Sequence, residues 1–332
     1  MARPALRALV LAAGRGERLR PLTLEIPKPL LPVAGRPLAA WTLERLAAAG
    51  CEVAALNLHH LGAAIRAALG ERFGGMSLAY SEEPELLGTG GALPPLAELL
   101  TAARAVAVVN GDSLCRWPLD RMLRAHRATG AAATLLVHRN ADPQPYGGGV
   151  AIEGGRIVAL RRGGLAWETA RARRVFAGAA VLDPEILARL PPGRSDIVAA
   201  LYEPLLAAGA TVGVVETSRP WFDLGTPARY LEAALAWGLA GLPERGARIV
   251  AGAEVDATAR LRRAVVETGA RVAAGARLVE SLVLPGAAIG SGARLARAIV
   301  GPRVAIGASE AFESCLLTVD GDGVRRAAPL TE

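Results

Sequence analysis

Short apolar runs alternate with amphipathic segments along the first 240 residues. The runs 6–12, 53–58, 76–80 and 105–109 are mostly aliphatic, which is typical of buried strands. The segments 37–49 and 61–69 have helical patterns, and 90–103 is expected to be helical although Pro94 and Pro95 interrupt it. This alternation predicts an α/β fold with a mostly parallel sheet and helices on both faces.

The following part of the chain is less regular. We expect strands over 131–137, 150–160, 175–182 and 211–215, and helices over 196–208 and 226–240. The segment 241–246 contains two glycines and a proline and is a plausible domain boundary. The predicted organisation is therefore a catalytic domain over 1–240, a repeat domain over 247–317 and a tail over 318–332.

Beyond the boundary, single aliphatic residues recur at steps of 6, 6 and 5 positions, so that the pattern repeats every 17 residues. Three columns result: Ile249, Val266, Val283 and Val300; Val255, Val272, Ile289 and Ile306; Leu261, Leu278 and Leu295. Hexapeptide-like periodicity predicts a parallel β-helix of triangular section, with one aliphatic side chain per side pointing inward. Chance periodicity in a tail rich in alanine, glycine and valine is the alternative, and eleven positions in phase make it improbable.

Composition and charge exclude several classes of protein. The net charge of +7 would suit nucleic-acid binding, but the arginines are scattered and aromatic residues make up only 4% of the chain. No apolar run approaches the roughly 20 residues of a membrane span. The three cysteines are far apart and odd in number, which favours a reducing cytoplasm over a disulfide framework. We therefore expect a cytoplasmic protein without nucleic-acid or membrane partners.

The stretch from Leu11 to Pro29 reads LAAGRGERLRPLTLEIPKP and follows the first predicted strand. Glycines allow backbone N–H groups to approach a ligand closely, and turn amides with arginines form a site for anions. Lys28 is the only lysine of the chain and lies between two prolines. An ordinary surface lysine is the alternative, but this position favours a contact with phosphate. The loop lacks the third glycine of the dinucleotide fingerprint and there is no Walker motif, so we interpret the stretch as a different triphosphate site.

Two aspartates are candidate metal ligands. Asp112 follows the apolar strand in the sequence VVNGD, and Asp223 lies in WFDLGTP. A turn aspartate and a helix-capping segment with Thr226 are the simpler interpretations of these motifs. Together with one ammonium group, two carboxylates suit metal-assisted displacement at phosphorus, where positioning and charge neutralisation provide most of the catalysis.

Two further glycine-rich elements could contact a substrate. The sequence LGTGG, residues 87–91, could contact a base or ribose through its backbone, although an ordinary turn is the alternative. The sequence YGGG, residues 146–149, could face a sugar, and a flexible hairpin is nearly as plausible. The four histidines have no cysteine or histidine at metal-binding spacing, and we assign them no role.

These motifs together resemble the sugar-1-phosphate nucleotidyltransferases, also called NDP-sugar pyrophosphorylases. The resemblance rests on 11–29, on Gly88 to Ala92, on Gly111-Asp112 and on Trp221 to Pro227, and it covers essentially the whole chain. It implies a Rossmann-like catalytic domain, a left-handed β-helix and Mg²⁺ as cofactor. It also implies that the oxygen of a sugar 1-phosphate attacks the α-phosphorus of an NTP and releases pyrophosphate.

The resemblance also implies roles for individual residues. Arg18, Lys28 and Asp112 would be catalytic, and Asp112 and Asp223 would share Mg²⁺. The sugar would lie against Tyr146, Gly147 and Gly178. The nucleotide would be bound by Leu11, Ala12, Ala13, Gly14, Arg15, Gly16, Gly88, Thr89, Asn110 and Gly111.

The sequence departs from the family pattern in ways that leave the substrate open. The segment 160–163, LRRG, lacks the glutamate and lysine that bind sugar phosphate in many members, and Arg161 or Arg162 could replace the cation. Glu17 also occurs in uridylyltransferases for N-acetylmuramate 1-phosphate, whereas LGTGGA resembles guanylyltransferases for mannose or heptose 1-phosphate. We favour mannose 1-phosphate and GTP, and glucose-1-phosphate thymidylyl- or uridylyltransferase activity stays open.

A non-catalytic regulatory or scaffolding relative is a further alternative, but such proteins typically lose the lysine or the metal aspartates, and here all three are present. Because the predicted β-helix contains no histidine, an acetyltransferase activity there is not expected. We expect the β-helix to have a structural role or to form a homo-oligomer.

Overall fold

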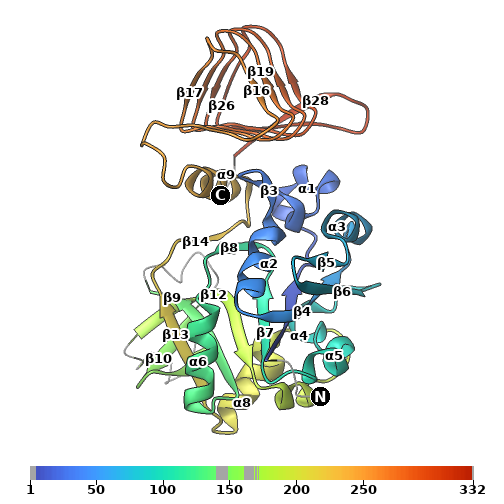
Figure 1. The fold of residues 1–332 in the computed structure, drawn as a ribbon, viewed down its shortest axis with the longest axis vertical. Coiled ribbons are helices and arrows are strands. Elements are labelled where there is room, and N and C mark those ends of the chain that lie inside the picture. Colours follow the sequence, from blue (N-terminus) through green and yellow to red (C-terminus); the bar gives the residue numbers. More distant parts are fainter. Residues whose placement is uncertain (1–4, 140–148, 161–167, 169, 171, 331–332) are drawn as a thin grey trace. The chain divides into compact units, whose positions relative to one another are not determined.

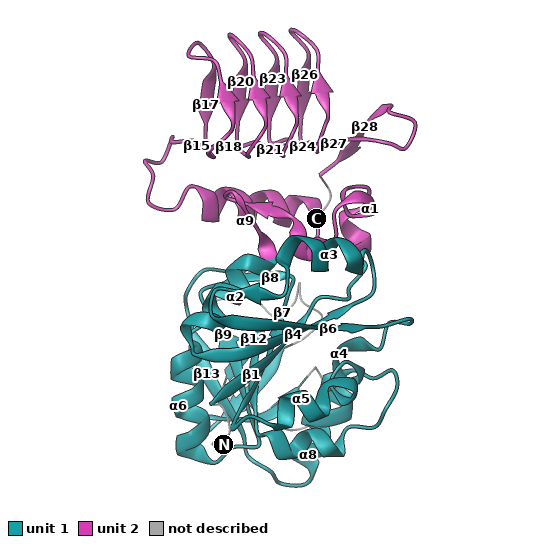
Figure 2. Cartoon of the chain, turned by 45° about the vertical axis from the view of Figure 1, so that its right-hand side comes forward, with its two compact units in different colours: residues 1–15, 39–221 teal, residues 16–38, 222–332 magenta. Residues whose placement is uncertain are grey.

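The computed structural model describes residues 5–139, 149–160, 168, 170 and 172–330. It divides into two compact units, which Figure 2 distinguishes by colour. Unit 1 consists of residues 1–15 and 39–221, and unit 2 consists of residues 16–38 and 222–332. The second unit therefore combines a short segment near the N-terminus with the whole C-terminal third. The predicted domains are continuous stretches of the chain, whereas each compact unit combines two separate stretches. The predicted domain boundaries stay predictions.

Unit 1 is built on a ten-stranded sheet with the order β10-β11-β13-β9-β12-β7-β1-β4-β6-β5 (Figure 1). The strands β7, β1, β4 and β6 are parallel neighbours, and β9 and β13 form a second parallel pair. The long strand β12 lies antiparallel between β7 and β9 and joins the two parallel groups. The bounds are β1 Leu6–Leu11, β4 Cys51–Leu58, β5 Arg72–Phe73, β6 Met76–Glu82, β7 Val106–Asn110, β9 Ala133–His138, β10 Val150–Glu153, β11 Arg156–Leu160, β12 Ala172–Leu182 and β13 Val212–Thr217.

The helices of this unit follow the sheet strands in the chain, as the alternating pattern predicts. They are α2 Leu38–Ala48, α3 Gly62–Leu69, α4 Gly88–Gly91, α5 Ala97–Thr101, α6 Leu119–Thr129 and α8 Glu203–Ala207, with the short turns η3 Pro94–Leu96, η5 Pro184–Arg189 and η6 Val198–Tyr202. One core cluster packs the aliphatic residues of α5, η5, η6 and α8 against β7, β9 and β12. The predicted α/β fold class is confirmed.

Two details differ from the sequence analysis. The predicted single strand over 150–160 is wrong, because it is a hairpin in which β10 and β11 pair antiparallel. Gly154 and Gly155 both have positive φ, 55° and 75°, and so form the turn that separates the strands. The helix α6 was not expected, although Leu119, Met122, Leu123 and His126 are its buried face. Its many arginines obscure that apolar stripe in the sequence.

Unit 2 contains the predicted parallel β-helix. Its short strands form three sheets, β15-β18-β21-β24-β27, β16-β19-β22-β25 and β17-β20-β23-β26, with β28 added antiparallel beside β27. The bounds are β15 Arg248–Ile249, β16 Glu254–Val255, β17 Arg260–Arg262, β18 Val265–Val266, β19 Arg271–Val272, β20 Arg277–Val279, β21 Leu282–Val283, β22 Ala288–Ile289, β23 Arg294–Ala296, β24 Ile299–Val300, β25 Ala305–Ile306, β26 Ala311–Glu313, β27 Cys315–Val319 and β28 Arg325–Pro329.

The register of these strands confirms the 17-residue period. Val266 pairs with Ile249 and with Val283, and Leu278 pairs with Leu261 and with Leu295. The interior residues of the middle coils form one buried core, in which Val266, Val283 and Leu278 are fully buried. Each coil therefore covers the apolar side chains of the next.

The remaining elements of unit 2 come from both ends of the first 240 residues. The N-terminal segment forms η1 Glu17–Leu19, α1 Leu22–Glu25, η2 Lys28–Leu30 and the hairpin of β2 Pro32–Val33 and β3 Arg36–Pro37. The C-terminal segment adds α9 Pro227–Gly238, whose N-terminus is capped by the side chain of Thr226. Two short strands remain: β8 Ser113–Cys115 belongs to unit 1, and β14 Trp221–Asp223 contains the boundary between the units in the chain. Within the described residues, no helix is long and apolar enough to cross a membrane.

Candidate functional site

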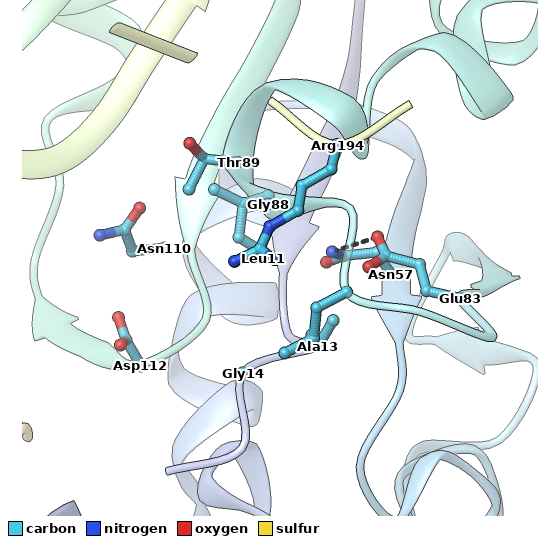
Figure 3. A pocket seen from close by; sticks show the side chains of 11 residues that line it. Leu11, Ala13, Gly14, Asn57, Glu83, Gly88, Thr89, Asn110, Asp112 and Arg194 are labelled. Atoms are coloured by element: carbon cyan, nitrogen blue, oxygen red, sulfur yellow. Dashed lines mark hydrogen bonds between the residues drawn. The ribbon is translucent and has the colours of Figure 1, made fainter. Parts of the chain in front are cut away.

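Unit 1 has a pocket of about 320 Å³ at the carboxyl ends of its central parallel strands (Figure 3). Pairing in register brings the last residue of β1, Leu11, opposite Asn57 of β4 on one side and Asn110 of β7 on the other. Ligands of open α/β sheets bind at this edge. The pocket is lined by Leu11, Ala13, Gly14, Asn57, Glu83, Leu86, Gly88, Thr89, Asn110, Asp112 and Arg194.

Two glycines of the predicted nucleotide site differ in what an added side chain would meet, and of the two only Gly14 lines the pocket. At Gly111 an added Cβ would lie 2.7 Å from the carbonyl oxygen of Leu11, which also accepts a hydrogen bond of 2.9 Å from the N–H of Gly111. Gly111 is therefore needed for the close approach of two loops. At Gly14 an added Cβ would meet nothing within 4 Å. The fold therefore does not require a glycine at this position. The open space beside Gly14 is accessible to a ligand that enters the pocket.

A buried polar network joins the loop after β1 to the glycine-rich segment after β6. The side-chain oxygen of Asn57 accepts a hydrogen bond of 2.8 Å from the N–H of Ala12, and its amide donates one of 2.8 Å to Glu83. The second carboxylate oxygen of Glu83 accepts the N–H of Leu87 at 3.0 Å. Asn57 and Glu83 are each only 4% exposed. This network fixes the loop after β1 and the glycine-rich segment after β6 relative to each other.

Arg15 is connected to the same network from the solvent side. Nδ1 of His59 lies 2.8 Å from the carbonyl oxygen of Glu83, and Nε2 lies 3.4 Å from the guanidinium of Arg15. If Nδ1 carries the proton and donates it to the carbonyl, Nε2 is free to accept from Arg15. His59, to which the sequence analysis assigned no role, therefore lies between the backbone of Glu83 and the guanidinium of Arg15.

The glycine-rich segment 88–91 packs against the loop that precedes η6. An added Cβ at Gly88, which has φ of +75°, would lie 2.5 Å from the carbonyl oxygen of Ser195. The N–H groups of Gly90 and Gly91 donate to that same oxygen, at 3.0 and 3.3 Å. The hydroxyl of Thr89 accepts the N–H of Ile197 at 2.9 Å. Most of these small residues therefore allow the backbone of this segment to lie close to the loop before η6. Gly88 and Thr89 also line the pocket.

Asn110 and Asp112 line the side of the pocket that lies across from Asn57 and Glu83 (Figure 3). The carboxylate of Asp112 lies 3.4 Å from the hydroxyl of Ser113. Gly178, a predicted sugar-binding residue, has φ of +76° and lies against the same segment, because its added Cβ would be 3.2 Å from Asn110 and 3.3 Å from the hydroxyl of Ser113. The structure therefore brings Gly178 of β12 beside the predicted metal ligand.

Unit 2 contains the remaining predicted residues of the first motif. Gly16 has φ of +62°, and its carbonyl accepts a hydrogen bond of 2.8 Å from the fully buried Thr23. Arg18 lies beside Asp223, since a Cβ added to Gly225 would be 2.8 Å from Nη2 of Arg18 and 3.1 Å from Oδ2 of Asp223. Residues about 200 positions apart are thus neighbours in this unit. Asp223 is also paired with Arg229 at 3.1 Å.

Lys28 begins the 3-10 turn η2 and is only 7% exposed. Tyr146 and Gly147, and also Arg161 and Arg162, lie outside the described residues. Among the residues that are described, no three side chains of histidine, cysteine, aspartate or glutamate form a metal-binding cluster. A cation at Asp112 would therefore need phosphate oxygens and water among its ligands, which is how Mg²⁺ is usually held at nucleotides.

Comparison with known proteins places this geometry in a family. Residues 7–237 match the family model described as Nucleotidyl transferase, and residues 245–312 match the model described as GlmU-like, C-terminal hexapeptide. The chain belongs to the nucleotidyl transferase family. The predicted resemblance to sugar-1-phosphate nucleotidyltransferases and the predicted enzyme class are confirmed.

Several proteins with named activities are similar to this nucleotidyl transferase. A mannose-1-phosphate guanylyltransferase of Mycobacterium tuberculosis is 36% identical over 253 residues, covering 73% of this chain and 69% of the relative. The catalytic subunit beta of mannose-1-phosphate guanylyltransferase of Danio rerio is 30% identical, over 68% of this chain and 63% of the relative. The structure of a UDP-glucose pyrophosphorylase from Acinetobacter baumanii has a TM-score of 0.61 at 21% identity, covering 71% of this chain and 94% of that one. This likeness shows the fold.

Four residues that line the nucleotidyl transferase pocket were absent from the sequence analysis: Asn57, Glu83, Leu86 and Arg194. Asn57 is a polar residue at the end of an aliphatic strand, and Glu83 directly follows another strand, so the rule that ligands bind at carboxyl ends could have indicated both. Arg194 lies in a loop with no recognisable motif, 82 positions after Asp112, which is the nearest other pocket residue in the chain. Only the tertiary structure identifies it.

We expect the variant Gly14→Ala to bind the nucleotide poorly while folding normally. The added methyl group meets no protein atom within 4 Å but enters the pocket, so the KM for NTP should rise about tenfold or more. The free energy of unfolding, measured in urea, should stay unchanged. Gly75→Ala is the matched control, because its Cβ also meets nothing and Gly75 does not line this pocket. An unchanged KM in Gly14→Ala would remove this glycine from the nucleotide site.

We expect Glu83→Gln to weaken both the fold and nucleotide binding. Glutamine has one acceptor oxygen where two buried donors, from Asn57 and Leu87, need acceptors. Leaving a buried donor unpaired costs about 1–3 kcal/mol of unfolding free energy. Urea denaturation and the KM for NTP measure the two effects. The neighbouring exposed Glu82 forms only a surface ion pair of 3.9 Å, so Glu82→Gln should change little; equal losses in both variants would contradict the role of the network.

Proposed function

We propose that this chain is a mannose-1-phosphate guanylyltransferase. In this reaction a phosphate oxygen of mannose 1-phosphate forms a bond to the α-phosphorus of GTP. The bond between the α-phosphorus and the oxygen that bridges to the β-phosphate breaks, and pyrophosphate leaves with that electron pair. The products are GDP-mannose and pyrophosphate. Two guanylyltransferases that act on mannose 1-phosphate are among the relatives, at 36% and 30% identity.

The observation that favours guanine is the position of Arg194. Its side chain points into the pocket that Leu11, Gly14 and Gly88 also line (Figure 3). A guanidinium presents two parallel N–H donors, which match the O6 and N7 acceptors of guanine. Adenine has an amino donor in place of O6, and pyrimidines lack this pair of acceptors. Within the described residues, Arg194 has no ion pair or hydrogen bond that would hold its guanidinium elsewhere.

The remaining roles follow from charge. The backbone of Gly14 and Gly16 and the side chains of Arg15, Arg18 and Lys28 are proposed to bind the triphosphate, whose negative charge they neutralise. Asp112 lines the pocket, and a carboxylate oxygen is a type of ligand that suits Mg²⁺.

Asp223 is the proposed second carboxylate of the magnesium site. When bound, Mg²⁺ would neutralise charge on the phosphates. Arg18, which lies beside Asp223, is proposed to keep a phosphate oxygen and the metal ligand in the same region of unit 2.

The sugar side of the reaction rests on fewer residues. Gly178 stays a proposed sugar contact, and its lack of a side chain allows β12 to approach Asn110 and Ser113, since an added Cβ would lie 3.2 and 3.3 Å from them. Tyr146 and Gly147 stay predicted sugar contacts. The three cysteines are free and buried, which suits the proposed cytoplasmic location, and assembly into a homo-oligomer stays a proposal.

The proposed function predicts the outcome of a substrate matrix. Each of GTP, ATP, UTP and dTTP is combined with mannose, glucose, heptose and N-acetylmuramate 1-phosphates, and pyrophosphate release is measured with Mg²⁺ present. We expect the highest kcat/KM for GTP with mannose 1-phosphate, because both substrate preferences should be expressed in the transition state. A clear preference for UTP or dTTP would contradict the proposal for the base, and no turnover with any pair would contradict catalysis.

The proposed base contact predicts the outcome of a second experiment, in which Arg194→Met is compared with the wild type on GTP and on 7-deaza-GTP. The analogue lacks only the N7 acceptor, so the wild type should lose about tenfold in kcat/KM, which corresponds to one charge-assisted hydrogen bond of roughly 1.5 kcal/mol. Arg194→Met should use both nucleotides equally poorly. Arg189→Met, which changes an arginine outside the pocket, is the control. If Arg194→Met weakens all four NTPs by the same factor, the guanidinium contacts phosphate and not guanine.

A further inference from the structure

The β-helix has a contact that a purely structural or oligomer-forming role does not explain. The tip of the β2–β3 hairpin is a turn in which Ala34 and Gly35 both have positive φ, 53° and 84°. A Cβ added to Gly35 would lie 2.7 Å from a methyl group of Val250, in the first coil of the β-helix. The hairpin that follows the Lys28 turn therefore rests directly on the β-helix.

At the centre of this contact is the carboxylate of Glu267, which follows β18. Glu267 is fully buried, and one of its oxygens accepts a hydrogen bond of 2.8 Å from the N–H of Gly35. Burial raises the pKa of Glu267, while the N–H groups of Gly35 and Ala34 and the charge of Arg248 oppose that shift. Burying a carboxylate is costly unless donors satisfy it. Only Oε2 is satisfied in this way, because Oε1 has no hydrogen-bond partner among the described residues. A simple packing contact would be made better by an apolar residue, so what Glu267 contributes is the hydrogen bond that holds the turn.

The chain between the hairpin tip and Lys28 is short and tightly held. The N–H of Leu31 donates to the carbonyl of Lys28 at 3.1 Å, and the N–H of Leu38 donates to the carbonyl of Leu31 at 3.0 Å. The hydroxyl of Tyr230, on α9, donates to the carbonyl of Pro32 at 2.6 Å. Pro29 and Pro32 further restrict the backbone. A displacement of the hairpin tip is therefore transmitted through this segment to Lys28.

We propose that Glu267 is a positioning residue for catalysis: by holding the Ala34–Gly35 turn, the first coils of the β-helix fix the 3-10 turn that carries Lys28. The proposal rests on the proposed function only in so far as Lys28 contacts the triphosphate. It gives the β-helix a part in the reaction that does not require a contact between the β-helix and the substrate. Catalysis is sensitive to such support, because displacing a charged group by about 1 Å can cost up to a hundredfold in rate.

The test measures kcat and KM for Glu267→Ala and Glu267→Gln at a temperature where circular dichroism shows each variant fully folded. Glu267→Ala removes the acceptor and should lower kcat/KM for NTP at least tenfold. Glu267→Gln keeps one acceptor oxygen and should recover most of that loss. Glu254→Ala is the control, because Glu254 lies on the same β-helix but is 77% exposed in a pair with Arg271. A lowered melting temperature with wild-type kcat/KM in Glu267→Ala would overturn the proposal.

A double-mutant cycle with Lys28→Ala separates positioning from general damage. If Glu267 acts through Lys28, adding Glu267→Ala to Lys28→Ala should change kcat/KM less than about twofold, because the two effects are not additive. Full additivity of the two losses would overturn the proposal.

Where Glu267→Ala does not fold, Gly35→Ala provides the same test from the hairpin side, since it strains the turn against Val250 and leaves the carboxylate in place. It should also lower kcat/KM and should be non-additive with Lys28→Ala. A wild-type rate in folded Gly35→Ala would count against the proposal. A wild type inactive on the whole substrate matrix would instead contradict the proposed function.

Discussion

The in-register parallel pairing of β7, β1 and β4 is the constraint on which the pocket depends. Because hydrogen bonds fix this register, the three strands end on one line, with Asn57, Leu11 and Asn110 side by side. A shift by one residue would turn every side chain of a strand to the other face of the sheet. The pocket is thus a consequence of strand pairing first, and only then of the loops that follow the strands.

The loops are held by a few polar contacts among many small residues. Asn57 and Glu83 are buried, and each satisfies backbone donors that would otherwise be unpaired at the edge of the sheet. Glycines at 88, 90, 91 and 111 allow backbone segments to meet at distances that a side chain would prevent. A site made in this way is largely preorganised before a ligand binds, which lowers the entropic cost of binding.

Unit 2 brings together segments that are far apart in the sequence. The segment 16–38, which carries Arg18 and Lys28, belongs to the same compact unit as the β-helix. Arg18 lies beside Asp223, and Gly35 is bound by Glu267, 232 positions later in the chain. The C-terminal repeat is therefore not an appendage attached behind a finished catalytic domain. Its first coils are the surface on which part of the predicted triphosphate site rests.

The sequence alone determined the repeating features of this protein. The 17-residue period of aliphatic residues predicts the β-helix, because every coil needs its apolar side chains at the same corners, and the alternating runs predict the α/β sheet. The motifs at 11–29 and at Asp112 indicate the chemistry, because glycine, lysine and aspartate are needed at set spacings. The predictions were wrong where a few residues reverse the direction of the chain. Gly154 and Gly155 do so and turn a predicted strand into a hairpin.

Only the tertiary structure decided which single residues complete the site. Arg194 and Glu267 lie in no motif, and each acts where folding brings distant segments together: Arg194 lines the pocket, and Glu267 accepts the N–H of Gly35. Such contacts depend on the positions of several packed elements at once. A periodic pattern is repeated along the chain and can be read from it, whereas a single contact between distant residues occurs once and leaves no pattern.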